Sequence, residues 1–171
     1  MSEKLGAAEA MARPGIRFVF SHPAHLLACG LGSGLSPVAP GAAGTLFAWL
    51  LYPLIKPWFS DLAFGGILVL GFLLGVAACH QTGRDLGVAD HGSIVWDEIV
   101  PFWLVLLMTP SGWMWQCVAF LLFRLFDMVK PSPAQWIDTH MKNGFGVMLD
   151  DVIAAAYTLL ALALIRLACP D

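Results

Sequence analysis

The sequence predicts an all-α membrane protein, and three observations support this. Of 171 residues 58% are hydrophobic and the mean hydropathy is +0.76, against an apolar share of ~45–50% in soluble domains. The run from Leu62 to Cys79 contains no charged residue and is long enough for a short membrane helix. Strand-like alternation is confined to Ser93–Val95. We therefore expect a compact multi-helix membrane protein with about four to five membrane-embedded helices.

The first residues carry cations but lack the apolar core of a secretion signal. Lys4, Arg13 and Arg17 are spread over a segment without a long hydrophobic stretch, so a cleaved signal peptide is not expected. We predict that residues 1–22 form an interfacial or partly disordered arm. Residues 23–171 are expected to form a single membrane domain.

Glycine and proline dominate the next segment, residues 23–45, which predicts a loop. Thr45 would then begin an apolar helix that ends near Ile55. Backbone N–H groups of Gly41 and Gly44, ahead of a helix start at Thr45, are suited to binding an anion. Close packing of small residues between helices explains the glycines equally well.

The rest of the chain alternates between apolar and polar stretches, with Pro101 expected in the first turn of its helix, where proline is tolerated. After Leu62–Cys79 the stretches are His80–Glu98 (polar), Ile99–Met108 (apolar), Thr109–Gly112 (turn), Trp113–Phe123 (apolar), Phe123–Asp151 (polar) and Val152–Ala168 (apolar). If each apolar stretch crosses or enters the bilayer, the three polar, glycine-containing segments converge on one face.

Most cations lie on that same face. It would carry Lys4, Arg13, Arg17, Arg84, Arg124, Lys130 and Lys142, whereas the opposite face would carry Lys56 and Arg166. The excess of Lys and Arg on cytoplasmic loops predicts that this face is cytoplasmic. A net charge of −3 and the lack of a basic stripe argue against nucleic-acid binding. The four cysteines show no metal or redox spacing and are read as buried, reduced side chains.

Carboxylates also gather on the predicted cytoplasmic face. They are Asp85, Asp90, Asp97, Glu98, Asp127, Asp138, Asp150 and Asp151. Carboxylates at close range repel one another unless a cation intervenes, and Mg²⁺ is a hard cation that prefers oxygen ligands. The simpler alternatives are a solvated acidic rim, or helix caps formed by one member of each adjacent pair.

Phe123–Asp151 is the most informative of the polar segments. Arg124, Asp127 and Lys130 are spaced i, i+3, i+6, so they lie along one helical face. This pattern fits an ion-pair ladder, but also a phosphate clamp of Arg124 and Lys130 beside a metal ligand, Asp127. We favour the clamp because Lys130-Pro131 ends the helix at the expected membrane surface. The histidines are scattered; none is assigned to a metal, and His91 is the best acid/base candidate among them.

Four motifs together resemble the phosphatidylglycerophosphatase A family of bacterial membrane enzymes. They are GLGSGLSPVAPGAAGTL (30–46), DHGSIVWDEIV (90–100), FRLFDMVKPSP (123–133) and GFGVMLDD (144–151). The resemblance implies a multi-pass protein of the bacterial inner membrane. It implies Mg²⁺-dependent hydrolysis of the terminal phosphate monoester of phosphatidylglycerophosphate, which yields phosphatidylglycerol. The expected partners are the lipid substrate and the bilayer, and no obligate protein partner is expected.

On this reading the carboxylates provide the catalytic and metal-binding groups. The nucleophile is either metal-bound water, with one carboxylate as general base, or a carboxylate itself. The predicted set is Asp97, Glu98, Asp127, Asp150 and Asp151, with Asp85 and Asp90 as second choices. Arg124, Lys130, Gly41, Gly44 and Thr45 are expected to bind phosphate.

Two residues depart from the family pattern, and two other functions remain open. Ala42 stands where the family usually has a threonine, and Pro101 where it usually has a glycine. An ion-coupled membrane carrier would use intramembrane carboxylates to bind cations without chemistry. A catalytically inactive scaffold would be supported only by the two departures.

Overall fold

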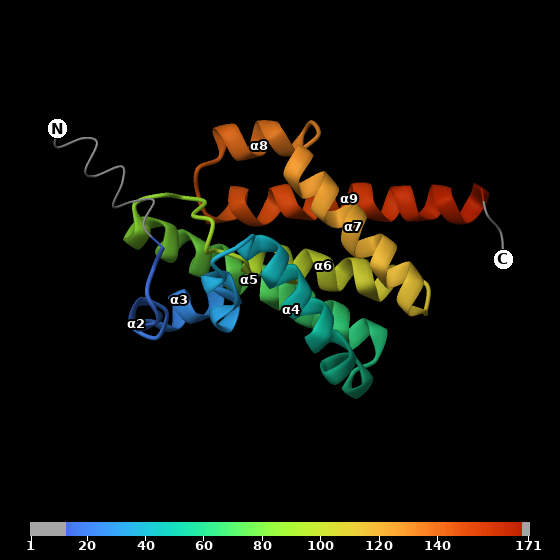
Figure 1. The fold of residues 1–171 in the computed structure, drawn as a ribbon, viewed down its shortest axis with the longest axis horizontal. Helices are drawn as coiled ribbons and strands as arrows, with labels where there is room; N and C mark the ends of the chain where they lie inside the picture. The colour runs from blue at the N-terminus through green and yellow to red at the C-terminus, as the bar shows by residue number, and fades with distance from the viewer. Residues whose placement is uncertain (1–12, 169–171) are drawn as a thin grey trace.

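The computed structural model describes residues 13–168, and every regular element in that range is helical (Figure 1). This confirms the predicted all-α class; Ser93–Val95 is not a strand. Residues 1–12 of the predicted arm lie outside the described range. The elements are α2 (Ile16–Val19), α3 (Pro23–Ala28), the 3₁₀ helix η1 (Gly30–Leu35), α4 (Pro40–Ile55), the 3₁₀ helix η2 (Lys56–Trp58), α5 (Asp61–Leu86), α6 (Trp96–Met108), α7 (Trp113–Val129), α8 (Ala134–His140) and α9 (Gly144–Ala168).

Helix α6 is the centre of the molecule, because α4, α5, α7 and α9 all pack against it. Its Ile99, Phe102 and Val105 are fully buried, as expected for a helix that is apolar on all sides. The Trp103 indole donates a hydrogen bond to the backbone carbonyl of Ala48 at 2.8 Å, which ties α6 to α4. The carboxylates at the start of α6 are thus held by the most enclosed element of the fold.

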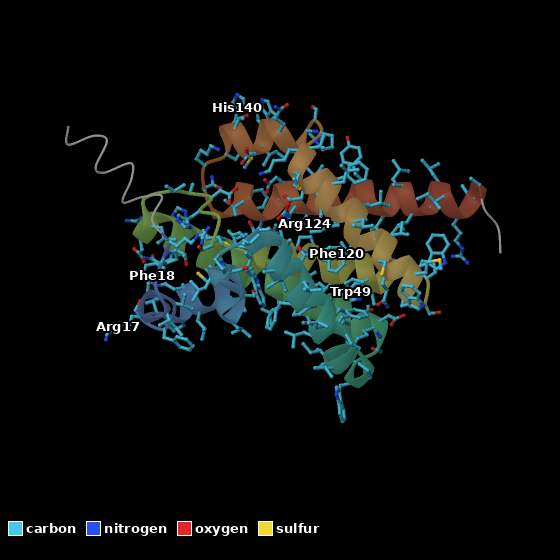
Figure 2. The ribbon with its side chains drawn as sticks, in the orientation of Figure 1. Arg17, Phe18, Trp49, Phe120, Arg124 and His140 are labelled. Atoms are coloured by element: carbon cyan, nitrogen blue, oxygen red, sulfur yellow. The ribbon has the colours of Figure 1, made fainter. Side chains whose placement is uncertain are left out.

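Helices α4 and α7 are joined by an aromatic and polar contact beside α6. The rings of Trp49 and Phe120 stack with centroids 5.6 Å apart (Figure 2). The Trp49 indole also donates to the side-chain oxygen of Gln116 at 2.7 Å. These contacts fix the position of α7, and with it the position of Arg124 near the helix's end.

Helices α5 and α9 pack closely because glycines lie between them. A Cβ on Gly75 would meet the Met148 side chain at 2.6 Å, and a Cβ on Gly144 would collide with the backbone at Val76 and His80. The absence of these side chains allows the two backbones to approach each other. The start of α9 is thereby held against the end of α5.

Within residues 13–168, α5 and α9 are the helices long and apolar enough to cross a membrane, with mean hydropathies of 2.4 and 1.9 over their most apolar windows. Large apolar side chains point outward from both. They include Leu62, Val69, Leu70, Leu73 and Leu74 of α5 and Leu160, Leu164 and Leu167 of α9. Helices α4, α6 and α7 have 16, 13 and 17 residues, which is short for a span.

The predicted loop over residues 23–45 was wrong, because this segment contains α3, η1 and the first turn of α4. Three predicted helix starts were also wrong. Helix α4 begins at Pro40 rather than Thr45, because proline is pre-organised for a first helical position. Helix α9 begins at Gly144 rather than Val152, because the Asn143 side chain accepts hydrogen bonds from the N–H groups of Phe145 and Gly146. Helix α6 begins at Trp96, so Pro101 lies in its second turn rather than its first.

Candidate functional site

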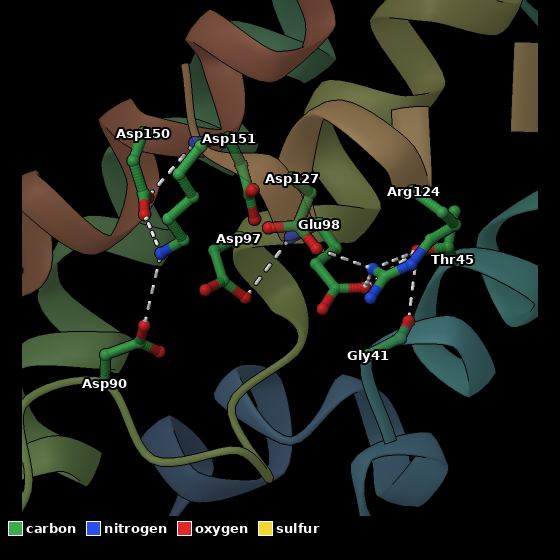
Figure 3. Close-up of polar contacts among 10 residues, drawn as sticks. Gly41, Thr45, Asp90, Asp97, Glu98, Arg124, Asp127, Asp150 and Asp151 are labelled. Atoms are coloured by element: carbon green, nitrogen blue, oxygen red, sulfur yellow. Dashed lines mark hydrogen bonds and ion pairs between the residues drawn. The ribbon is translucent and has the colours of Figure 1, made fainter. Parts of the chain in front are cut away.

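The polar segments of the chain meet in one cavity of about 340 Å³. It lies where α6 and α9 begin, α7 ends and α4 begins (Figure 3). The residues that line it are Ala39, Pro40, Gly41, Asp90, Gly92, Ile94, Asp97, Glu98, Arg124, Asp127, Met128, Lys130, Asp150 and Asp151. Five of the predicted catalytic carboxylates and both predicted phosphate-binding cations are among them.

Arg124 organises one half of the cavity. Its Nη1 donates to Glu98 Oε2 at 2.5 Å and lies 3.1 Å from Asp127 Oδ2. The Thr45 hydroxyl donates to the same Glu98 oxygen at 2.7 Å and accepts from Arg124 at 3.2 Å. One guanidinium therefore neutralises two carboxylates from different helices, and Thr45 holds one of them in place.

Gly41 closes this half of the cavity from the first turn of α4. A Cβ at this position would collide with the carboxylate of Glu98 and would lie 2.9 Å from Arg124 Nη2. Glycine is needed here because the charged pair packs directly on the backbone. Gly44 has a different role, because a Cβ there would meet Val95 at 2.6 Å. It packs helices together and does not line the cavity.

Lys130 organises the other half. Its Nζ lies 2.6 Å from Asp150 Oδ2, 3.2 Å from Asp138 Oδ1 and 3.8 Å from Asp90 Oδ2. The residue ends α7 in a left-handed conformation, with φ of 45°, which turns its backbone out of the helix. Burial lowers the pKa of Lys130, but the surrounding carboxylates outweigh burial and the net pKa is raised. The carboxylates around Lys130 therefore favour its charged form.

Asp90 reaches the cavity from the loop before α6. Its side chain is 35% exposed. Desolvation raises the pKa of Asp90, while the positive charge of Lys130 acts in the opposite direction. Asp90, Asp138 and Asp150 each have one carboxylate oxygen that lies within 4.8 Å of the other two.

Asp97 and Asp151 are buried, with residue exposures of 6% and 3%. Asp97 accepts a hydrogen bond from the Glu98 backbone at 3.2 Å. Neither carboxylate has a cation within ion-pair distance among residues 13–168, and both are close enough to Asp127 and Asp150 to be repelled by them. Buried carboxylates in this situation are costly unless a cation or proton neutralises them.

The donor set fits a hard divalent metal. All the candidate ligands are carboxylate oxygens, which such ions prefer. They come from the loop before α6 and from α6, α7 and α9, and the acidic groups outnumber the two cations that line the cavity. The acidic cluster can therefore bind a metal ion.

Several residues fall outside the cavity. Asp85 pairs with His25 at 2.8 Å and with Gln81, on the far side of α5. His91 lines a neighbouring pocket, where its Nδ1 accepts from the Ser93 backbone. Thr45 reaches the site only through Glu98 and Arg124.

Sequence reasoning did not assign Asp138 to the site, although it contacts Lys130. Asp138 also lies 3.7 Å from Lys142, at the i, i+4 spacing of a helical ion pair. No local pattern connects it to Lys130, because the two residues are joined only by the turn between α7 and α8.

Comparison with known proteins gives a consistent result. The family model described as phosphatidylglycerophosphatase A matches residues 26–166. No solved structure matches the chain significantly.

Three curated proteins are similar over most of their length. Phosphatidylglycerophosphatase A of Escherichia coli K12 is 45% identical over 142 residues, which cover 81% of this chain and 80% of the relative. Its counterpart in Haemophilus influenzae is 45% identical over 146 residues, 85% and 90% of the two chains. A Bacteroides thetaiotaomicron protein, named provisionally as a phosphatidylinositol-3-phosphatase, is 37% identical over 82% and 92% of the two chains. The family model and these identities show that the chain belongs to the phosphatidylglycerophosphatase A family.

Proposed function

We propose that the protein hydrolyses the terminal phosphate monoester of phosphatidylglycerophosphate to give phosphatidylglycerol and phosphate. The observation that supports this most directly is the single cavity in which Arg124 and Lys130 face the carboxylates of α6, α7 and α9. Cations that bind a phosphate beside oxygen ligands for a metal are the groups that phosphoryl transfer requires.

Arg124 and Lys130 would bind the phosphate oxygens. The Arg124 guanidinium presents several donors in a plane, which suits two phosphate oxygens at once. The Lys130 ammonium lies across the cavity, so the two cations approach the phosphate from different sides. When a phosphate enters, it would replace some of the contacts that Arg124 and Lys130 now make with carboxylates.

Mg²⁺ is the proposed metal. The predicted ligands are Asp97, Glu98, Asp127, Asp150 and Asp151; of these Glu98 and Asp127 already share Arg124. When bound, the ion would polarise phosphoryl oxygens and favour deprotonation of water. Asp97 and Asp151, which have no cationic partner among the described residues, are the best placed to accept the proton of the attacking water.

The proposed location is the inner membrane, with α4 to α7 and α9 embedded and the cavity open to the cytoplasm. Helices α4, α6 and α7 are too short to cross upright and would be tilted or shallow. The outward apolar side chains of α5 and α9 support their contact with lipid. A site at the interface suits a substrate whose tails stay in the bilayer while its phosphate reaches water.

Phosphate release from the purified protein in mixed micelles tests the proposal. We expect turnover of phosphatidylglycerophosphate with Mg²⁺, loss with EDTA and recovery when Mg²⁺ is added back. Comparing the turnover of phosphatidate and phosphatidylinositol 3-phosphate in the same assay would show whether the protein discriminates between lipid headgroups. A folded protein that releases no phosphate in the presence of metal would exclude the enzyme and leave the carrier, which an ion-uptake assay in vesicles would detect.

A further inference from the structure

A second, entirely apolar groove lies on the same helices as the candidate active site. It has a volume of about 250 Å³ and is lined along its length by Gly65, Phe72, Val100, Pro101, Leu104 and Val152. Two further residues of α5 complete it, and every lining residue is apolar or glycine. The groove is formed between α5 and α6, with α9 at one end.

The groove and the candidate active-site cavity are lined by residues on one face of α6. Asp97, Pro101 and Leu104 are spaced i, i+4, i+7 and therefore lie on one face of the helix. Asp97 lines the cavity, whereas Pro101 and Leu104 line the groove. On α9, Val152 of the groove directly follows Asp151 of the cavity.

The direction of the groove follows from how α5 and α6 are paired. A Cβ on Gly71 would meet Val100 at 3.3 Å, and the ring of Phe64 lies 6.2 Å from that of Trp103. The two helices are therefore antiparallel. The Phe72 end of the groove is near the cavity, and the Gly65 end lies ~10 Å farther along the helix.

We propose that this groove holds one acyl chain of the lipid substrate and so positions its phosphate in the cavity. The inference rests on the proposed function. The occupant is an acyl chain because the groove has no polar lining, shares a face of α6 with a site that would bind a lipid headgroup, and runs along the helix α5 that is apolar enough to cross a membrane. An extended hydrocarbon chain has the shape and chemistry that such a groove accepts.

Gly65 and its neighbour Gly66 provide a matched pair of variants. A Cβ on either residue would meet nothing within 4 Å, so the first atom of an added side chain has open space at both positions. Gly65 lines the groove, whereas Gly66 is exposed and does not. Gly65→Leu would fill the distal end of the groove, and Gly66→Leu would add the same side chain to the same helix outside it. Gly65→Ala would fill it only in part.

The test measures kcat/KM for a dioleoyl and a dihexanoyl form of phosphatidylglycerophosphate in the presence of Mg²⁺. We expect Gly65→Leu to lower the dioleoyl value at least about tenfold relative to Gly66→Leu, with a smaller loss for Gly65→Ala. Both leucine variants should match the wild type on the dihexanoyl substrate, whose short chains do not reach Gly65.

Equal dioleoyl values for Gly65→Leu and Gly66→Leu would overturn the inference. So would an equal loss on both substrates, or a change of oligomeric state in Gly65→Leu alone, which would assign the groove to a second copy of the chain. A wild-type protein inactive on both substrates would instead refute the proposed function, and the inference with it.

Discussion

At the scale of single residues, the cavity is an arrangement of shared charges. Arg124 contacts Glu98 and Asp127, and Lys130 contacts Asp150 with two further carboxylates nearby. Removing one partner from a buried charged group leaves the other unpaired, which is costly. Substitutions in the cavity therefore need to preserve shape if they are to report on chemistry rather than folding.

Asp127→Asn meets this condition, because it keeps the side-chain shape and removes the charge. We expect turnover to fall at least about 100-fold, with expression near that of the wild type, since an amide oxygen can still accept from Arg124. The measurement is phosphate release from micelles, with protein yield as the second readout. Asp61→Asn is the matched control, because the Asp61 side chain is 84% exposed and pairs with Lys56 at the start of α5. Full activity in Asp127→Asn would show that this carboxylate is not part of the site.

At the scale of elements, close packing of α5 and α9 determines where Asp150 and Asp151 lie. The Asn143 cap begins α9 early enough to place both carboxylates in its second turn. Gly144 then allows this turn to lie directly against α5 near Val76 and His80. The position of the two acidic residues relative to α6 depends on this contact.

Gly144→Ala tests that dependence. The added Cβ has no room against backbone atoms of α5, so we expect unfolding in detergent to become easier by about 1–3 kcal/mol. Activity should fall as well, because α9 must shift and carry Asp150 and Asp151 with it. Gly66→Ala on the outer face of α5 is the control and should keep both stability and turnover. A wild-type melting temperature for Gly144→Ala would mean that α9 adjusts without cost.

At the scale of the whole molecule, charge is distributed unequally between the two ends. The candidate site contains Arg124 and Lys130. Arg84 and Lys142 line another pocket, between the end of α5 and the start of α9. The opposite end, near Met108 and Pro110, contains Arg166. This asymmetry is the basis for the proposed cytoplasmic orientation of the cavity.

Reporter fusions test this orientation. With the cavity in the cytoplasm, α9 would run outward and its last residues would lie in the periplasm. Alkaline phosphatase fused after residue 168 should then be active, and a green fluorescent protein in the same place should be dark. Fusions within the turn after α8, on the cavity side, should give the opposite pattern. The reverse result at both positions would invert the proposed topology.

The helical class, the apolar helix α5 and most of the charged residues that line the candidate cavity could be predicted from the sequence alone. Hydropathy and the lack of strand alternation are local properties, and they were enough for the class. Convergence of the polar segments followed from the alternation of apolar and polar stretches, because two successive apolar stretches take the chain away and return it to the same end. Asp97, Glu98, Asp127, Asp150, Asp151, Arg124 and Lys130 could therefore be expected together, and the structure places them around one cavity.

The pairing of charged residues and the first residues of the helices could be seen only in the tertiary structure. Arg124 is paired with Glu98, and Asp138 contacts Lys130, because helices far apart in sequence pack side by side around α6. The same packing assigns Gly41 to the site and Gly44 to the helix interface, although they are three residues apart. Such differences depend on which face of a helix meets which neighbour. That is set by the close approach of backbones in the core, which no local pattern of residues encodes.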